Sequence, residues 1–190
     1  MAVLLWCHGG CFTGGSVDND QKLRSYLTSH NICQCIPIDF SLKSWHLAIR
    51  DIYRYALSDF QGRKVVLGGI SSGAMMAHHV ANKLKLPAVL ICPVLKPADR
   101  HQSLSNDLQE RQLKFFGSLE EMANIQDSIA PPNNLRYILY GTKDVRAPVS
   151  GFEKWLEGDR CIVDVLDKGH EMCSDPPCEL IAQGIAKLLN

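Results

Sequence analysis

Apolar residues gather along this chain in short runs, separated by longer stretches in which they recur every three or four positions. Short apolar runs are typical of buried strands, and the wider spacing is typical of helices that pack one face. The two kinds of segment alternate from start to end, which predicts an α/β fold: a three-layer α/β/α sandwich with a mostly parallel sheet. We expect six strands, at residues 2–7, 32–38, 64–68, 88–92, 136–140 and 161–166.

Two of the expected helices have clear amphipathic spacing. One apolar stripe runs over residues 45–56, and a second runs over residues 181–189 at the C-terminus. Before the second stripe, Asp175 is a residue type that caps helices, and Pro176 suits a first helical position, where no N–H is needed. We therefore expect the last helix to begin next to these two residues.

The longest stretch without a strand pattern runs from about residue 97 to residue 135 and has apolar residues at helical intervals. It predicts a small helical, cap-like insertion over a single domain that spans residues 1–190, because no linker-like segment divides the chain. Within the insertion, Phe115, Phe116 and Met122 either line a pocket or pack onto the domain. Packing is the favoured interpretation.

Proline provides a further constraint on the sheet. Pro37 lies near the end of the second expected strand, where it cannot donate a ladder hydrogen bond. This strand is therefore expected at an edge of the sheet.

Charge and composition limit the classes of partner. Twenty basic and twenty acidic residues balance each other and do not cluster, which argues against a nucleic-acid or anionic-membrane binder and favours a small-molecule partner. The apolar run at residues 2–7 is shorter than a membrane span and lacks signal-peptide features, so a cytoplasmic location is expected. Phosphate-binding motifs fail because Phe12 and Gly15 stand where a glycine and a lysine are required.

The eight cysteines are expected to be mainly buried thiols, because most of them lie in apolar, strand-like runs. His170, Cys173 and Cys178 could supply three zinc ligands. A structural zinc motif, however, needs a second pair of ligands beside a cysteine pair, and no such pair is present in the sequence. No metal ion is therefore predicted.

The strongest chemical signal is the pentapeptide Gly-Ile-Ser-Ser-Gly at Gly69–Gly73, between the third expected strand and a helical stretch over residues 74–84. A sharp turn from strand to helix strains the central serine, and the residues two positions away must be very small. Ser71 has glycines at both of these positions, whereas Ser72 does not, so Ser71 is the predicted nucleophile. The alternative is an ordinary turn, because the motif alone has many chance matches.

A glycine-rich loop, His-Gly-Gly-Cys-Phe-Thr-Gly-Gly, follows the first expected strand at residues 8–15. Backbone N–H groups in such a loop can stabilise the oxyanion that develops when a serine attacks a carbonyl group. We expect an oxyanion hole formed by Gly10, Cys11 and Ser72. His8 is more suited to bracing this loop than to acting as a base.

A serine hydroxyl needs a base within hydrogen-bond reach and a third group that orients the base. Asp144 follows the fifth expected strand and His170 follows the last, which places both at the same sheet edge as the serine. We predict His170 as the base and Asp144 as the orienting acid. Asp164 and Asp167 are weaker alternatives for the acid, and the alternative for His170 is a surface-loop histidine.

These motifs, in the order Ser, Asp, His, resemble the α/β-hydrolase superfamily over nearly the entire chain. The opening strand with His8 and Gly9 is similar to the third strand of that fold, which implies a minimal version without the first two strands. The short length and residues 86–97 also resemble the small YqiA-type esterases, although the chain departs from their pattern at Gly10 and at residues 72–74. This resemblance implies short acyl esters as substrates.

The sequence thus predicts a serine hydrolase, an esterase that cleaves a small acyl ester through an acyl-enzyme. The expected chemistry requires no cofactor. Two alternatives remain: a thioesterase or other acyl hydrolase with the same triad, and a non-catalytic ligand-binding protein of this fold.

Overall fold

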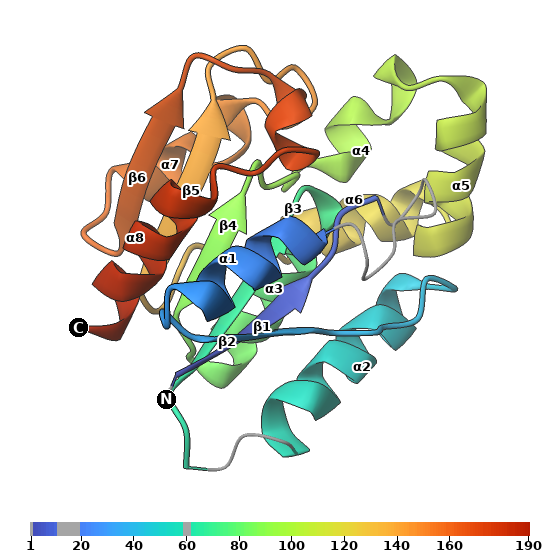
Figure 1. Ribbon diagram of the computed structural model, residues 1–190. Helices are drawn as coiled ribbons and strands as arrows, with labels where there is room; N and C mark the ends of the chain where they lie inside the picture. The colour runs from blue at the N-terminus through green and yellow to red at the C-terminus, as the bar shows by residue number, and fades with distance from the viewer. Residues whose placement is uncertain (1, 11–19, 59–61) are drawn as a thin grey trace.

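The computed structural model of the chain describes residues 2–10, 20–58 and 62–190. Its sheet has six strands in the order β2-β1-β3-β4-β5-β6, and every neighbouring pair is parallel (Figure 1). The predicted fold class is therefore confirmed, and each strand begins and ends within two residues of its expected limits. The strands are β1 (Val3–Cys7), β2 (Gln34–Pro37), β3 (Val65–Ile70), β4 (Ala88–Ile91), β5 (Arg136–Gly141) and β6 (Cys161–Leu166).

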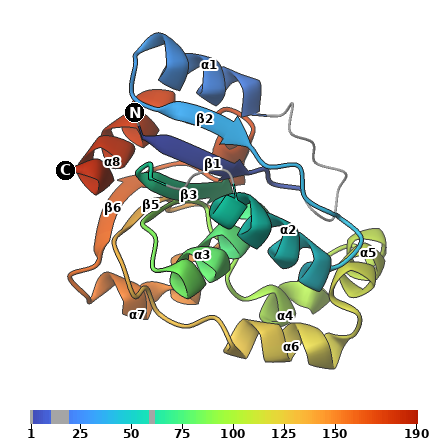
Figure 2. The same cartoon turned by 90° about the horizontal axis from the view of Figure 1, so that it is seen from below.

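Helices cover both faces of the sheet, as Figure 2 shows. One face is covered by α1 (Gln21–Ser29) and α8 (Cys178–Leu189), and the other by α2 (Trp45–Ser58), α3 (Ser72–Leu84) and α7 (Glu153–Leu156). Each face has its own buried hydrophobic cluster, because the alternating side chains of every central strand point to opposite faces. No helix within the described residues has the length and apolar character needed to cross a membrane.

The segment between β4 and β5 is helical and lies beside the carboxyl ends of the central strands (Figure 1). Phe115, Phe116 and Met122 are buried in the cluster that α2 and α3 share, so these three side chains pack onto the domain. The helices are α4 (Pro97–Arg100), η2 (His101–Ser103), α5 (Asn106–Phe116) and α6 (Leu119–Asp127).

The expected start of the last helix was wrong. Helix α8 begins at Cys178, and Pro177 precedes it without a capping side chain. Asp175 instead forms an ion pair with Lys22 of α1. Because this carboxylate pairs with a lysine on the neighbouring helix, it does not cap the first turn of α8.

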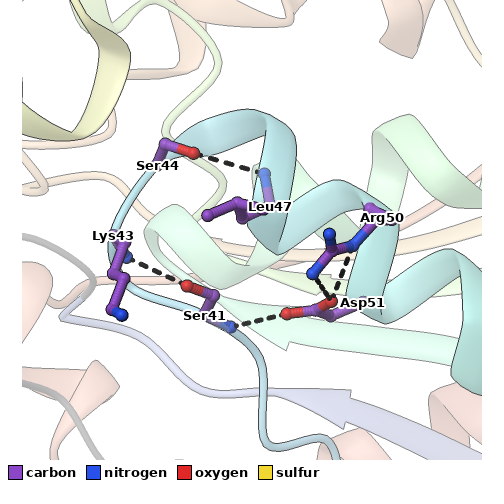
Figure 3. Close-up of polar contacts among 6 residues, drawn as sticks. All are labelled: Ser41, Lys43, Ser44, Leu47, Arg50 and Asp51. Carbon is purple, nitrogen blue, oxygen red and sulfur yellow. Dashed lines mark hydrogen bonds and ion pairs between the residues drawn. The ribbon is translucent and has the colours of Figure 1, made fainter.

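The connection from β2 to α2 is held by short-range polar contacts (Figure 3). The Ser44 hydroxyl accepts a hydrogen bond from the Leu47 N–H at 3.3 Å, which satisfies one of the free amides in the first turn of α2. The Asp51 carboxylate accepts from the Ser41 N–H at 3.1 Å and also from Arg50. These contacts join the end of the edge strand to the helix that packs beside α3.

Strand β2 is an edge strand, as Pro37 predicted. The N–H groups of Gln34 and Ile38 donate to the carbonyl groups of Ala2 and Trp6. Successive residues of a strand direct their amides to opposite sides, so the nitrogen of Pro37 lies on the side away from β1. The proline therefore removes no hydrogen bond from the sheet.

Candidate active site

Ser71 occupies the sharp turn between β3 and α3. Its backbone is in the left-handed region, with φ 54° and ψ −121°, which a residue with a side chain rarely adopts. A Cβ on Gly69 would lie 2.5 Å from the Gly73 carbonyl oxygen, and a Cβ on Gly73 would lie 2.3 Å from the carbonyl oxygen of Cys7. The turn therefore requires glycine on both sides of the serine, and it lifts the hydroxyl above the sheet.

The structure brings together the three side chains that the sequence placed at separate strand ends. The Ser71 Oγ lies 3.0 Å from the His170 Nε2, and the His170 Nδ1 lies 2.8 Å from the Asp144 Oδ2. Both distances are within hydrogen-bond range. This geometry allows the imidazole to accept the proton of the serine hydroxyl while the carboxylate holds the ring in place.

Asp144 is fully engaged in the turn that follows β5. Its Oδ1 accepts hydrogen bonds from the N–H groups of Arg146 and Ala147 at 2.8 and 2.9 Å, which leaves Oδ2 for His170. Burial acts to raise the pKa of the Asp144 carboxyl, but the hydrogen bonds from His170 and Ala147 outweigh it and hold this pKa below its usual value. A carboxylate that stays ionised is suited to stabilising a protonated imidazole.

The two other acids considered from the sequence are engaged elsewhere. The Asp164 carboxylate accepts a hydrogen bond from the Tyr137 hydroxyl at 2.8 Å, and Asp167 pairs with Lys143 at 2.8 Å on the surface. Neither has a hydrogen bond with His170 within the described chain.

His170 also lies beside two thiols, Cys92 and Cys173. Burial acts to lower the pKa of His170, but the Asp144 carboxylate and the Cys173 sulfur outweigh it and raise this pKa to about 9. The Cys92 thiol, by donating to the Cys173 sulfur, lowers the pKa of Cys173, and the neighbouring imidazole acts in the same direction. The imidazole and the sulfur thus shift each other's pKa in opposite directions, upward for His170 and downward for Cys173.

Among the described residues, Cys92, His170 and Cys173 form the one group with the composition and proximity to hold a metal ion, their ligand atoms lying within 4.8 Å of one another. Two thiolates and an imidazole suit a zinc ion. However, both ring nitrogens of His170 are already hydrogen-bonded to Ser71 and Asp144. A metal ion at this position would compete with the triad geometry.

A pocket of about 620 Å³ opens above the serine. Gly10, with φ 72°, lines it together with Ser71, Ser72 and His170. Two of the three residues expected in the oxyanion hole thus share a pocket with the nucleophile, and the Ser72 amide belongs to the first turn of α3. The third, Cys11, falls outside the described residues.

The insertion contributes other pocket residues than those the sequence suggested. Leu104 and Leu108 supply an apolar wall, and Arg100 adds a guanidinium group from the end of α4. Arg146, from the turn after β5, also lines the pocket. Neither arginine was predicted. For Arg146 a signal existed, since it follows the expected acid by two residues at the same edge of the sheet.

The remaining histidines have structural environments. The His8 ring stacks on Phe40 at 4.5 Å between centroids, and its Nδ1 lies 2.9 Å from the Gly9 carbonyl oxygen. His78 is buried and contacts the Ala130 carbonyl and the Arg136 guanidinium. His46 forms an ion pair with Glu121 at the surface.

Comparisons with known proteins address the fold. A protein-family model described as alpha/beta hydrolase fold matches residues 4–155. Carboxyl esterase 2 of the fungus Tuber melanosporum superposes with a TM-score of 0.76 at 18% identity, over 99% of this chain and 79% of that one. Alpha/beta hydrolase domain-containing protein 10 from mouse gives 0.72 at 15%, over 98% and 89%.

A hyperthermophilic esterase from the archaeon Pyrobaculum calidifontis gives a TM-score of 0.70 at 18% identity, over 98% of this chain and 75% of that one. Among curated protein sequences no match was found. At these identities the structural likeness establishes the fold.

Proposed function

This chain belongs to the alpha/beta hydrolase fold family, and from that premise we propose that it is a serine hydrolase that cleaves carboxylic esters of small acyl groups. The observation that carries the proposal is the continuous hydrogen-bonded chain from Ser71 through His170 to Asp144, with distances of 3.0 and 2.8 Å. A ligand-binding protein has no need of a base and an acid aligned behind a strained serine. Esterases are also among the proteins of similar fold.

In the proposed reaction, His170 takes the proton of the Ser71 hydroxyl as the oxygen attacks the ester carbonyl carbon. The oxyanion that forms is stabilised by backbone N–H groups of the Gly10 loop and of Ser72. His170 then gives its proton to the leaving alcohol, and the acyl-enzyme remains. Water, activated by the same imidazole, hydrolyses the acyl-enzyme and restores the serine.

The test is active-site labelling with a fluorophosphonate probe, combined with a screen of 4-nitrophenyl esters of increasing acyl length. We expect the wild type to be labelled and to hydrolyse short esters, and Ser71→Ala to do neither. Ser58→Ala, at an exposed position at the end of α2, serves as the matched control and should behave as wild type. A wild type that is neither labelled nor active would contradict the proposal, as would labelling of Ser71→Ala.

Short acyl chains are part of this proposal, on the strength of the resemblance to the small YqiA-type esterases and of a pocket of about 620 Å³. Matched oxygen esters and thioesters in the same screen distinguish an esterase from a thioesterase. The cytoplasmic location stays a prediction.

A further inference from the structure

Two arginines enter the pocket from different parts of the chain. Arg100 ends α4 and is half-buried, whereas Arg146 is exposed and lies two residues after Asp144. Within the described chain, neither guanidinium group has a hydrogen bond or an ion pair: the polar contacts of both residues are made by their backbone atoms. A half-buried guanidinium group without a partner is costly, because burial weakens its hydration.

The two positive charges also act on each other. Burial lowers the pKa of Arg100, and the charge of Arg146 acts in the same direction, which places the two groups within electrostatic range. Asp144 attracts Arg100, but the carboxylate oxygens of Asp144 are taken up by His170 and by two backbone amides. The attraction of Asp144 still outweighs the repulsion of Arg146 at Arg100, so burial is what lowers this pKa.

The carboxylates that line the pocket do not pair with these arginines. Glu171 accepts a hydrogen bond from the Gly169 N–H at 2.8 Å. Asp20 is buried, and burial raises its pKa while Trp6, His8 and Arg24 act to lower it. Within the described part of the pocket, no lining carboxylate thus pairs with either guanidinium group.

The pocket also has an apolar part. Four aliphatic side chains line it: Ile70, Val94, Leu104 and Leu108. Such a surface accepts the methylene groups of an acyl chain, while guanidinium groups suit an oxyanion at its end. The combination differs from a uniformly apolar pocket for a neutral acyl group.

We propose that Arg100 and Arg146 bind an oxyanion group of the substrate, so that the preferred substrates are esters that carry a carboxylate or a phosphate beside the scissile bond. This inference rests on the proposed esterase function. Arginine binds carboxylate and phosphate through two parallel charge-assisted hydrogen bonds, and such an anion would supply the partner that neither guanidinium group has within the described chain.

The first experiment compares kcat/KM for charged and neutral esters of matched size. The 4-nitrophenyl half-ester of glutaric acid is paired with 4-nitrophenyl valerate, and 4-carboxyphenyl acetate is paired with phenyl acetate. These pairs place the carboxylate on the acyl side or on the alcohol side. We expect the charged member of at least one pair to be favoured about tenfold or more, as a charge-assisted hydrogen bond allows.

Variants assign the preference to the arginines. Arg100→Gln and Arg146→Gln should each lower kcat/KM for the charged ester about tenfold and leave the neutral ester within about twofold. Arg54→Gln, on the exposed surface of α2, is the matched control and should change neither. Equal rates on charged and neutral esters in both pairs would overturn the inference, as would variants that slow both members equally.

A binding experiment separates this inference from the proposed function. Calorimetry with Ser71→Ala measures the binding of glutarate and of inorganic phosphate, with and without Arg100→Gln in the same chain. If no ester is hydrolysed but arginine-dependent anion binding persists, the proposed function fails, and with it the ester substrates, while the arginine anion site stands. If esters are hydrolysed without a charge preference and neither anion binds, the inference fails and the function stands. The tighter anion identifies carboxylate or phosphate as the recognised group.

Discussion

Two neighbouring groups raise the pKa of His170. The Asp144 carboxylate lies on one ring nitrogen, and the Cys173 sulfur lies beside the ring, so the pKa is raised to about 9 although burial acts to lower it. A base must be neutral to accept the serine proton. At neutral pH most of the resting protein would therefore have an imidazolium ion in the position of the base.

We expect kcat/KM for a neutral ester to rise as the pH rises, with a midpoint well above the ordinary histidine pKa of about 6.5. The Cys173→Ser variant removes the neighbouring thiolate and should shift the midpoint toward lower pH. The measurement is the pH profile of kcat/KM between pH 5.5 and 10. Cys161→Ser is the control and should leave the midpoint in place, because it changes a thiol at the start of β6, the end of the strand opposite to His170. A wild-type midpoint at or below 6.5 would refute this account.

At the scale of residues, sequence reasoning located side chains whose positions follow from topology. Ser71, Asp144 and His170 each follow a strand, and parallel strands carry such residues to one edge of the sheet. Arg100 could not be found in this way, because its relation to the triad depends on how the insertion folds over the sheet. Cys92 follows β4 and reaches the same edge, but its approach to Cys173 depends on how η4 (His170–Cys173) packs against the end of β4, which no local spacing encodes.

Among the elements, the turn between β3 and α3 has the strictest sequence requirement. Gly73 lies where helix α3 touches the loop after β1, and an added Cβ would lie 2.3 Å from the carbonyl oxygens of Cys7 and His8. Backbone atoms cannot move aside as a flexible side chain can. The same close approach brings the start of α3 next to the Gly9–Gly10 segment.

Gly73→Ala should therefore destabilise the protein by about 1 to 3 kcal/mol or more, the usual range for overpacking. It should also reduce fluorophosphonate labelling. Gly151→Ala is the matched control, because a Cβ there would have no neighbour within 4 Å. Urea unfolding of the two variants measures the difference. Equal stability of both would mean that the turn tolerates a side chain.

The ends of helices were harder to predict than their faces. The apolar stripes of α2 and α8 were both found, but α8 begins at Cys178 rather than next to Asp175. Helix α1 was expected between the first two strands only without bounds, because only Leu23 and Leu27 are buried along its nine residues. A short apolar stripe gives little indication of where a helix begins and ends. A potential capping residue is no better guide, because the ion pair that Asp175 forms with Lys22 depends on the packing of segments far apart in the sequence.

For the molecule as a whole, the buried His78 and the half-buried His79 of α3 link stability to pH. Burial lowers the pKa of His78 from 6.5 to about 3 and that of His79 from 6.5 to about 4. Below pH 6.5 the unfolded chain binds protons at these positions that the folded protein does not. Stability is therefore lost as the pH falls below 6.5. The raised pKa of His170 acts in the opposite direction, but more weakly over this range.

We expect the free energy of unfolding to fall by about 1 to 2 kcal/mol for each of these two histidines between pH 7 and pH 5. Urea unfolding at both values measures it. His79→Gln should lose less stability over this interval than the wild type, whereas His30→Gln, at the exposed position that follows α1, should lose as much. A wild type as stable at pH 5 as at pH 7 would show that these histidines titrate normally.

The nitrogen of Pro37 also affects whether β2 can pair with a strand of another molecule. An uncapped outer strand can recruit a matching strand from a neighbour, which is how sheets grow into aggregates. On the outward side of β2, the proline offers no donor at the place where such a ladder would continue. Pro37 therefore interrupts the pairing of β2 with a strand of another molecule, while the pairing of β2 with β1 remains complete.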